Sequence, residues 1–219
     1  DRPHRARQRC RRLMPLVVRA QVVDIRADTP KDSDIFLVDT NAWYWLFYSR
    51  ASLSPDAPQA YQLADYPAFL KAAVGAQSAL HCYGLTFAEL AHNIEKAERE
   101  IYSAQAGKGI YPKPFRHDYP NQRRKLVSLI SDTWADVLSV SAMLNLEMDS
   151  GFMQSALSLF PSVGLDGYDL FMAEAALKAG VTQIVTDDGD YATVPGLTIF
   201  TANQKVIQAA QNAGKLLTR

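Results

Sequence analysis

Three features of the chain predict an α/β protein built around a parallel sheet. Short apolar segments rich in β-branched residues, such as residues 35–38 and 181–186, have the composition of buried parallel strands. These segments alternate with longer stretches of helical periodicity, an alternation that is typical of parallel sheets with right-handed crossovers. The chain has 219 residues, 48% of them hydrophobic, which suffices for one sizeable domain with a full core.

Each expected element follows from a local signal. Thr40 or Asn41 can cap the first helix, and Pro67 either kinks the second helix or divides it in two. Thr86 followed by Glu89 is a capping-box pattern that opens the third. Strands are expected at residues 16–25 (an edge strand or a hairpin), 35–38, 79–85, 137–140, 181–186 and 197–200, and helices at 42–48, 61–74, 86–105, 121–136, 145–160, 169–179 and 202–217.

The formal net charge of zero hides an uneven distribution. Residues 1–13 hold six arginines against Asp1, which leaves 17 basic and 22 acidic residues in the rest of the chain. A body of that sign does not indicate general nucleic-acid binding, so such a partner needs a local basic patch or bound cations. Met14 offers an alternative start, and residues 1–13 are therefore either a native basic arm or a non-native, disordered lead.

Cysteine usage and hydropathy favour a cytoplasmic protein. Cys10 and Cys82 are too few and too far apart in the sequence to indicate a disulfide framework. No apolar run has the length of a membrane span, and no hydrophobic segment before Pro15 resembles a signal peptide. We therefore expect a cytoplasmic location and no membrane partner.

Carboxylates recur where the predicted strands end or the helices begin. Because the carboxyl ends of parallel strands meet at one edge of a sheet, these side chains are expected to gather there. Each also has a purely structural explanation, as an Asx turn, a capping box or a solvated turn. Asp166 is the expected cap of the 169–179 helix, so Asp169 is not needed for capping. The acids concerned are Asp39, Glu89, Asp169, Asp187, Asp188 and Asp190.

Such a gathering of acids predicts a metal cofactor. Converging carboxylates repel one another, and hard divalent cations with oxygen ligands usually hold them together. Mg²⁺ or Mn²⁺ is expected, whereas zinc is disfavoured because no Cys or His has suitable spacing. Ions of this kind, alone or paired, activate water and neutralise charge during attack on a phosphodiester.

Four segments resemble, in the same order, the four acidic motifs of the PIN-domain nucleases. The segments are Val38-Asp39-Thr40-Asn41, Thr86-Phe87-Ala88-Glu89-Leu90, Tyr168-Asp169-Leu170-Phe171-Met172-Ala173-Glu174-Ala175-Ala176 and Thr186-Asp187-Asp188-Gly189-Asp190-Tyr191. The resemblance implies a PIN-like three-layer α/β/α sandwich with a central parallel sheet in residues 35–219. A helical insertion at about residues 91–136 and an N-terminal extension at residues 1–34 depart from the compact VapC-type toxins.

The resemblance also implies an activity and residue roles. It implies a Mg²⁺- or Mn²⁺-dependent endoribonuclease that hydrolyses RNA phosphodiester bonds, as in VapC-type toxins. Carried over by position, the catalytic and metal-binding acids are Asp39, Glu89, Asp169 and Asp188, and the supporting residues are Asn41, Thr186, Asp187 and Asp190, the last two as substitutes for Asp188.

Residues 108–125 form a basic and aromatic loop that is the best candidate for an RNA contact, because Lys and Arg hold phosphate while Tyr and Phe stack on bases. A solvated loop is the alternative. The candidate contact residues are Lys113, Arg116, Arg123 and Arg124.

The expected partners are an RNA substrate, an antitoxin protein if the chain is a toxin, and a second copy of the chain. One alternative function is a non-catalytic PIN-like module that binds RNA or a protein. A phosphatase of the haloacid-dehalogenase type is disfavoured, since it needs an acid where Asn41 stands.

Overall fold

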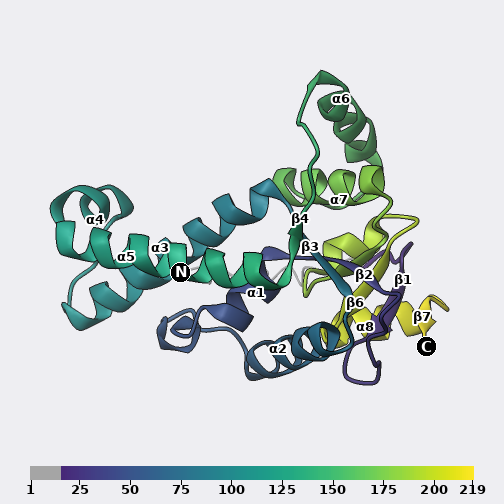
Figure 1. Ribbon diagram of the computed structural model, residues 1–219, viewed down its shortest axis with the longest axis horizontal. Helices are drawn as coiled ribbons and strands as arrows, with labels where there is room; N and C mark the ends of the chain where they lie inside the picture. The colour runs from purple at the N-terminus through teal and green to yellow at the C-terminus, as the bar shows by residue number, and fades with distance from the viewer. Residues whose placement is uncertain (1–15) are drawn as a thin grey trace, which may run out of the picture.

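A computed structural model describes residues 16–219, in which helices cover both faces of a central sheet (Figure 1). The strands of this part are β1 (Gln21–Asp24), β2 (Ile35–Val38), β3 (Ala79–Cys82), β4 (Ala142–Met143), β5 (Gln183–Val185), β6 (Thr198–Thr201) and β7 (Leu216–Leu217). They pair in the order β4-β3-β2-β5-β6-β1-β7, and every pair is parallel. The predicted α/β class with a parallel sheet is confirmed.

The helices of residues 16–219 divide between the two faces. One group is α1 (Thr40–Phe47), α2 (Ala60–Gly75), α3 (Gly84–Gln105), α4 (Pro112–Asp118) and α5 (Pro120–Val140), and the other is α6 (Ser150–Leu159), α7 (Gly167–Ala179) and α8 (Gln204–Asn212). Short 3-10 helices occur at η1 (Ala51–Leu53), η2 (Phe160–Ser162) and η3 (Gly189–Thr193).

Alternating side chains of the strands build two separate cores. On β2, Phe36 and Val38 pack with the first group of helices, whereas Leu37 packs with the second. On β6, Phe200 and Ile199 divide in the same way. Phe36 of β2 meets Phe200 of β6 edge-on, with ring centroids 4.8 Å apart. Side chains of both strands therefore pack together in the first core. Two cores on opposite faces of one sheet give three layers, consistent with a PIN-like sandwich.

The long helices α3 and α5 run antiparallel and project from the sheet, with α4 near their far end (Figure 1). Phe87, near the start of α3, packs on Trp134, near the end of α5, with ring centroids 5.3 Å apart. Further out, Glu98 of α3 pairs with Lys125 of α5 at 3.0 Å. The predicted antiparallel return of the 121–136 helix is therefore confirmed.

The strand predicted in residues 16–25 forms, but its predicted place at an edge or in a hairpin is wrong. β1 lies between β6 and β7 and is parallel to both. The edge strand β7 comes from the end of the segment predicted as the 202–217 helix. That helix stops at Asn212 because Gly214, with φ +64°, turns the chain into the left-handed region and allows the last residues to pair with β1.

One open alternative is decided and two further predictions are corrected. Pro67 lies inside one helix, α2, so the alternative of two separate helices is excluded. The strand predicted at residues 137–140 is the last turn of α5, and the strand follows it as β4; short apolar runs fit either conformation. Part of the predicted loop at residues 108–125 is helical, since Pro112 occupies the first turn of α4, where its missing N–H costs nothing.

No helix among residues 16–219 is long and apolar enough to cross a membrane. The arginine-rich lead and the predicted alternatives for residues 1–13 lie outside the described residues.

Candidate functional site

Asp39 directly follows the central strand β2, on the side of the sheet where the carboxyl ends of the strands lie. It occupies the N-cap position of α1, where Thr40 or Asn41 was expected, and its side chain makes no capping bond. Its carboxylate instead accepts a hydrogen bond from Thr186 Oγ1, 2.8 Å from Asp39 Oδ2. Asp39 is only 3% exposed, so burial and this one hydroxyl fix its position.

The loop after β5 is joined to Asp39 through the same hydroxyl. Thr186 is fully buried, and its Oγ1 accepts a hydrogen bond from the backbone N–H of Asp188 at 2.9 Å. The Asp188 side chain accepts one in turn from the backbone N–H of Asp190 at 2.8 Å. Thr186 thus orients two of the predicted acids at once.

Asp169 stands in the first turn of α7, on the other side of the sheet. Asp166 caps this helix as predicted, accepting hydrogen bonds from the N–H groups of Tyr168 and Asp169 at 2.9 and 3.1 Å. The Asp169 carboxylate is therefore free of capping, and it accepts a hydrogen bond from the buried Tyr191 hydroxyl at 2.9 Å.

Glu89 is not a capping residue, which corrects its structural explanation from the sequence. α3 begins at Gly84, so Thr86 is its third residue, and Thr86 Oγ1 accepts the backbone N–H of Tyr83 at 3.2 Å. Glu89 lies in the next turn, half-buried, and is left for another role.

The four predicted acids lie within electrostatic range of one another. Burial raises the pKa of Asp39 well above its usual value. The negative charges that raise it further are those of Glu89, Asp169 and Asp188. Burial also raises the pKa of Glu89, against the effect of the Thr40 hydroxyl, and raises that of Asp169 to about 7. None of the four acids forms an ion pair with another residue of the described chain.

The donor chemistry of this acid cluster, defined as Asp39, Glu89, Asp169 and Asp188, fits a hard divalent cation. Beside it, the buried Thr40 Oγ1 has no hydrogen-bond partner of good geometry. Within residues 16–219 no three Asp, Glu, His or Cys side chains are already arranged to hold one ion. The acids are thus close enough to repel one another, although they do not form a preassembled ion site.

Asp187 and Asp190, the sequence-based substitutes for Asp188, lie differently. Asp187 is held by α2, where it accepts hydrogen bonds from the Tyr61 and Tyr66 hydroxyls and from Gln62 Nε2, the last at 2.7 Å. The charge of Asp188 is among those that raise the pKa of Asp39. The pKa of Asp190 is raised by burial and by the charges of Asp188 and Asp166, so Asp188 is the acid of this loop whose charge acts on Asp39.

The predicted RNA contacts lie on α4 and α5. Arg116 and Arg123 both pair with Glu95 of α3, at 2.5 and 3.4 Å, and Arg124 bonds to Asn121. Lys113 forms no ion pair within the described residues. Two of the four cations thus share one carboxylate, which leaves one net positive charge on these three side chains.

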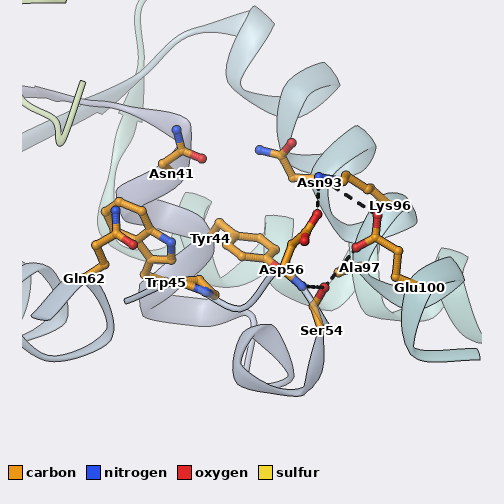
Figure 2. A pocket seen from close by; sticks show the side chains of 11 residues that line it. Asn41, Tyr44, Trp45, Ser54, Asp56, Gln62, Asn93, Lys96, Ala97 and Glu100 are labelled. Carbon is orange, nitrogen blue, oxygen red and sulfur yellow. Dashed lines mark hydrogen bonds and ion pairs between the residues drawn. The ribbon is translucent and has the colours of Figure 1, made fainter. Parts of the chain in front are cut away.

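A polar cavity of about 200 Å³ lies next to the acid cluster and shares only Asn41 with the predicted site (Figure 2). Its walls come from α1, α3, the start of α2 and the loop before it. Its lining includes Asn41, Tyr44, Trp45, Ser54, Asp56, Asn93, Lys96, Ala97 and Glu100. Sequence reasoning missed Asn93, although its place one helical turn after Glu89 was a usable signal, and missed Tyr191, which ends the last acidic motif.

Comparisons with known proteins do not identify a family for this chain. No family model and no curated protein matches the chain. Among solved structures, the chain is similar to one chain in the crystal structure of VapBC2 from Rickettsia felis bound to a DNA fragment from their promoter, with a TM-score of 0.45 and 12% sequence identity, covering 76% of this chain and 98% of that chain. The function is therefore argued from the side chains.

Proposed function

We propose that the protein is a Mg²⁺- or Mn²⁺-dependent endoribonuclease whose acid cluster holds the metal. The observation that supports this proposal best is the mutual repulsion of four acids that form no ion pair in the described chain, a repulsion that His92 beside Glu89 relieves only in part. Repulsion of this kind costs stability, and a divalent cation removes the cost. Such a site at the carboxyl edge of a parallel sheet is where α/β proteins bind ligands.

In this proposal Asp39, Glu89, Asp169 and Asp188 bind the ion through carboxylate oxygens. When bound, the ion supplies an activated water and neutralises charge on the phosphodiester under attack. Thr186 holds Asp39 and Asp188 in register, and Tyr191 fixes the rotamer of Asp169. Without a cation the cluster repels the phosphate backbone, so RNA binding at this edge depends on the metal.

The first test is RNA cleavage with Mn²⁺ by wild type, Asp39→Asn and a matched control, Asp136→Asn. Asp136 is an exposed residue of α5 whose side chain makes no hydrogen bond or ion pair in the described chain. We expect Asp39→Asn to lose at least about 100-fold in rate, because a metal ligand is removed, and Asp136→Asn to match wild type.

A calorimetric Mn²⁺ titration distinguishes the alternative of a non-catalytic module that binds RNA or protein. The proposal requires Mn²⁺ binding that Asp39→Asn weakens and Asp136→Asn does not. Full RNA cleavage by Asp39→Asn, or no Mn²⁺ uptake by wild type, refutes the proposal. The toxin role, an antitoxin partner and a homodimer stay predictions, which copurification and light scattering can check.

A further inference from the structure

The polar cavity of Figure 2 continues directly from the acid cluster along one face of α3. Residues four apart on a helix share a face, and Glu89, Asn93 and Ala97 follow this spacing. Asn93 and Ala97 line the cavity, while Glu89 belongs to the acid cluster. On α1, Asn41 lies two residues after Asp39 and also lines the cavity. A ligand group in the cavity is therefore a neighbour of whatever the acid cluster binds.

Three polar side chains face this cavity without a partner. The Tyr44 hydroxyl forms no hydrogen bond in the described chain, although Tyr44 is 92% buried, its exposed fraction being 8%. The side-chain amides of Asn41 and Asn93 likewise form none with residues 16–219, and Figure 2 shows them reaching toward the same space from α1 and α3. These three polar groups are open to the cavity and not sealed from solvent, so a ligand with both donors and acceptors is able to pair with them in place of water.

The charges of the cavity argue against a phosphate as that ligand. Among the described residues Lys96 is the one cation that lines the cavity, and its Nζ lies 3.3 Å from Asp56 and 4.0 Å from Glu100. Glu100 also pairs with Arg99 at 3.3 Å, so the two carboxylates are balanced by two cations and the cavity has no free positive charge with which to bind an anion. Ser54 donates a hydrogen bond to the Glu100 carboxylate at 3.0 Å and accepts one from the backbone N–H of Asp56 at 3.3 Å, which ties the loop before α2 to α3. The ligand selected is uncharged and rich in hydrogen-bonding groups.

The aromatic walls and the volume of the cavity limit the class of ligand further. Tyr44 and Trp45 contribute aromatic side chains to the wall, and aromatic rings favour flat partners. A volume of about 200 Å³ is below the range typical of drug-sized ligands, so the cavity takes a single small ring system.

We propose that this cavity is a nucleobase subsite that receives the base next to the phosphodiester bound at the acid cluster, with Asn41, Asn93 and Tyr44 reading its hydrogen-bonding edge. This inference rests on the proposed ribonuclease function. Amide side chains discriminate bases through paired donors and acceptors, so the subsite gives cleavage a base preference. Trp45 or Tyr44 supplies the apolar contact that every base tolerates.

The first experiment measures base binding without cleavage. Adenosine, guanosine, cytidine, uridine and, separately, N-acetyl-lysine methylamide are titrated into the full ¹⁵N-labelled protein, and the side-chain amide resonances are followed by NMR. We expect one nucleoside to shift the Asn41 and Asn93 amides more than the other three do. The shift of Asn41 should disappear in Asn93→Ala and persist in Asn212→Ala, an exposed amide on α8. Shifts with the lysine analogue alone, which would indicate a basic segment of a protein partner, or no nucleoside-dependent shift, overturn the proposal.

The second experiment measures kcat/KM on RNA oligonucleotides that differ in one base beside the cleaved bond. Asn93→Ala should lower kcat/KM for the preferred base about tenfold and leave the other bases within about twofold, while Asn212→Ala changes neither. A uniform loss across all four bases contradicts the subsite. If wild type does not cleave at all, the proposed function fails, but the nucleoside titration still decides whether the cavity binds a base.

Discussion

Two buried carboxylates of this protein have opposite surroundings. Glu98 and Asp39 are 4% and 3% exposed. Glu98 accepts hydrogen bonds from the Tyr48 hydroxyl at 2.6 Å and from the charged groups of Arg50 and Lys125. Burial alone would raise its pKa, but these three donors outweigh burial and lower it. Asp39 has one hydroxyl donor and acidic neighbours, and its pKa is raised.

The difference separates a completed structural site from an incomplete one. Around Glu98 the chain provides all the positive charge that the buried carboxylate requires. Around Asp39 the described chain provides none, and the repulsion is stored at the sheet edge where ligands bind. Natural proteins tolerate such local cost where a site has a function, which is why the comparison points to a cation.

The largest expected effect on stability comes from removing the charge of Glu98. Glu98→Gln leaves Arg50 without its buried partner, and we expect the free energy of unfolding to fall by about 3 kcal/mol. Asp39→Asn, which removes a repelled charge, should be at least as stable as wild type without metal. Urea denaturation at pH 7 measures both variants, and equal losses in the two would contradict the contrast.

Addition of Mn²⁺ should reverse the order of stability of wild type and Asp39→Asn. Mn²⁺ at 100 times its dissociation constant should raise the free energy of unfolding of wild type by about 2.7 kcal/mol, because it binds the folded state alone. Asp39→Asn should gain much less. Thermal melts with Mn²⁺ and with EDTA measure this, and an equal gain in both proteins would place the ion elsewhere.

The two sites should also respond oppositely to pH. The pKa of Asp169 is raised to about 7, so the metal-free protein loses stability as pH rises from about 4 to 7 through this group, and Asp169→Asn should gain on wild type over that window. The pKa of Glu98 is lowered, so its contribution is present above its unfolded value and is lost as pH falls below it. Denaturation of wild type, Asp169→Asn and Glu98→Gln from pH 3.5 to 8 measures these trends. The same dependence of unfolding free energy on pH in all three proteins would refute them.

The smallest effect concerns the residue that positions Asp169. Tyr191→Phe removes one hydrogen bond of 2.9 Å, and we expect unfolding free energy to change by about 1 kcal/mol and kcat for RNA cleavage to fall several-fold. Tyr102→Phe, near the end of α3 and several helical turns from Glu89, provides a matched control. An unchanged kcat in Tyr191→Phe would show that the hydroxyl does not orient Asp169 for catalysis.

The sequence predicted the parts of this fold that depend on local signals. The run 35–38 followed by Asp39 was recognisable as a buried strand with an acid at its end, and Asp166 as a helix cap. The pairing of Leu216 and Leu217 with β1 was not, because a two-residue edge strand has no periodicity of its own and depends on partners 194 residues away in the chain.

The candidate site was predictable to a similar degree. Four acids at strand and helix ends share one edge by topology alone, without knowledge of any contact. The roles of Asp187 and Asp188 were not separable, since adjacent acids in a loop are distinguished only by the Tyr66 and Gln62 side chains that bind one of them. Asn93 lies on the face of Glu89, but only the folded α1 shows that this face borders a cavity.

The most direct measurement is anomalous scattering from crystals of the wild-type protein soaked in Mn²⁺. The account predicts a peak between α1, α3 and α7, within about 2.0–2.4 Å of a carboxylate oxygen of Asp39 and of at least one other acid of the cluster. A Mn²⁺-saturated crystal with no peak beside Asp39 would contradict it.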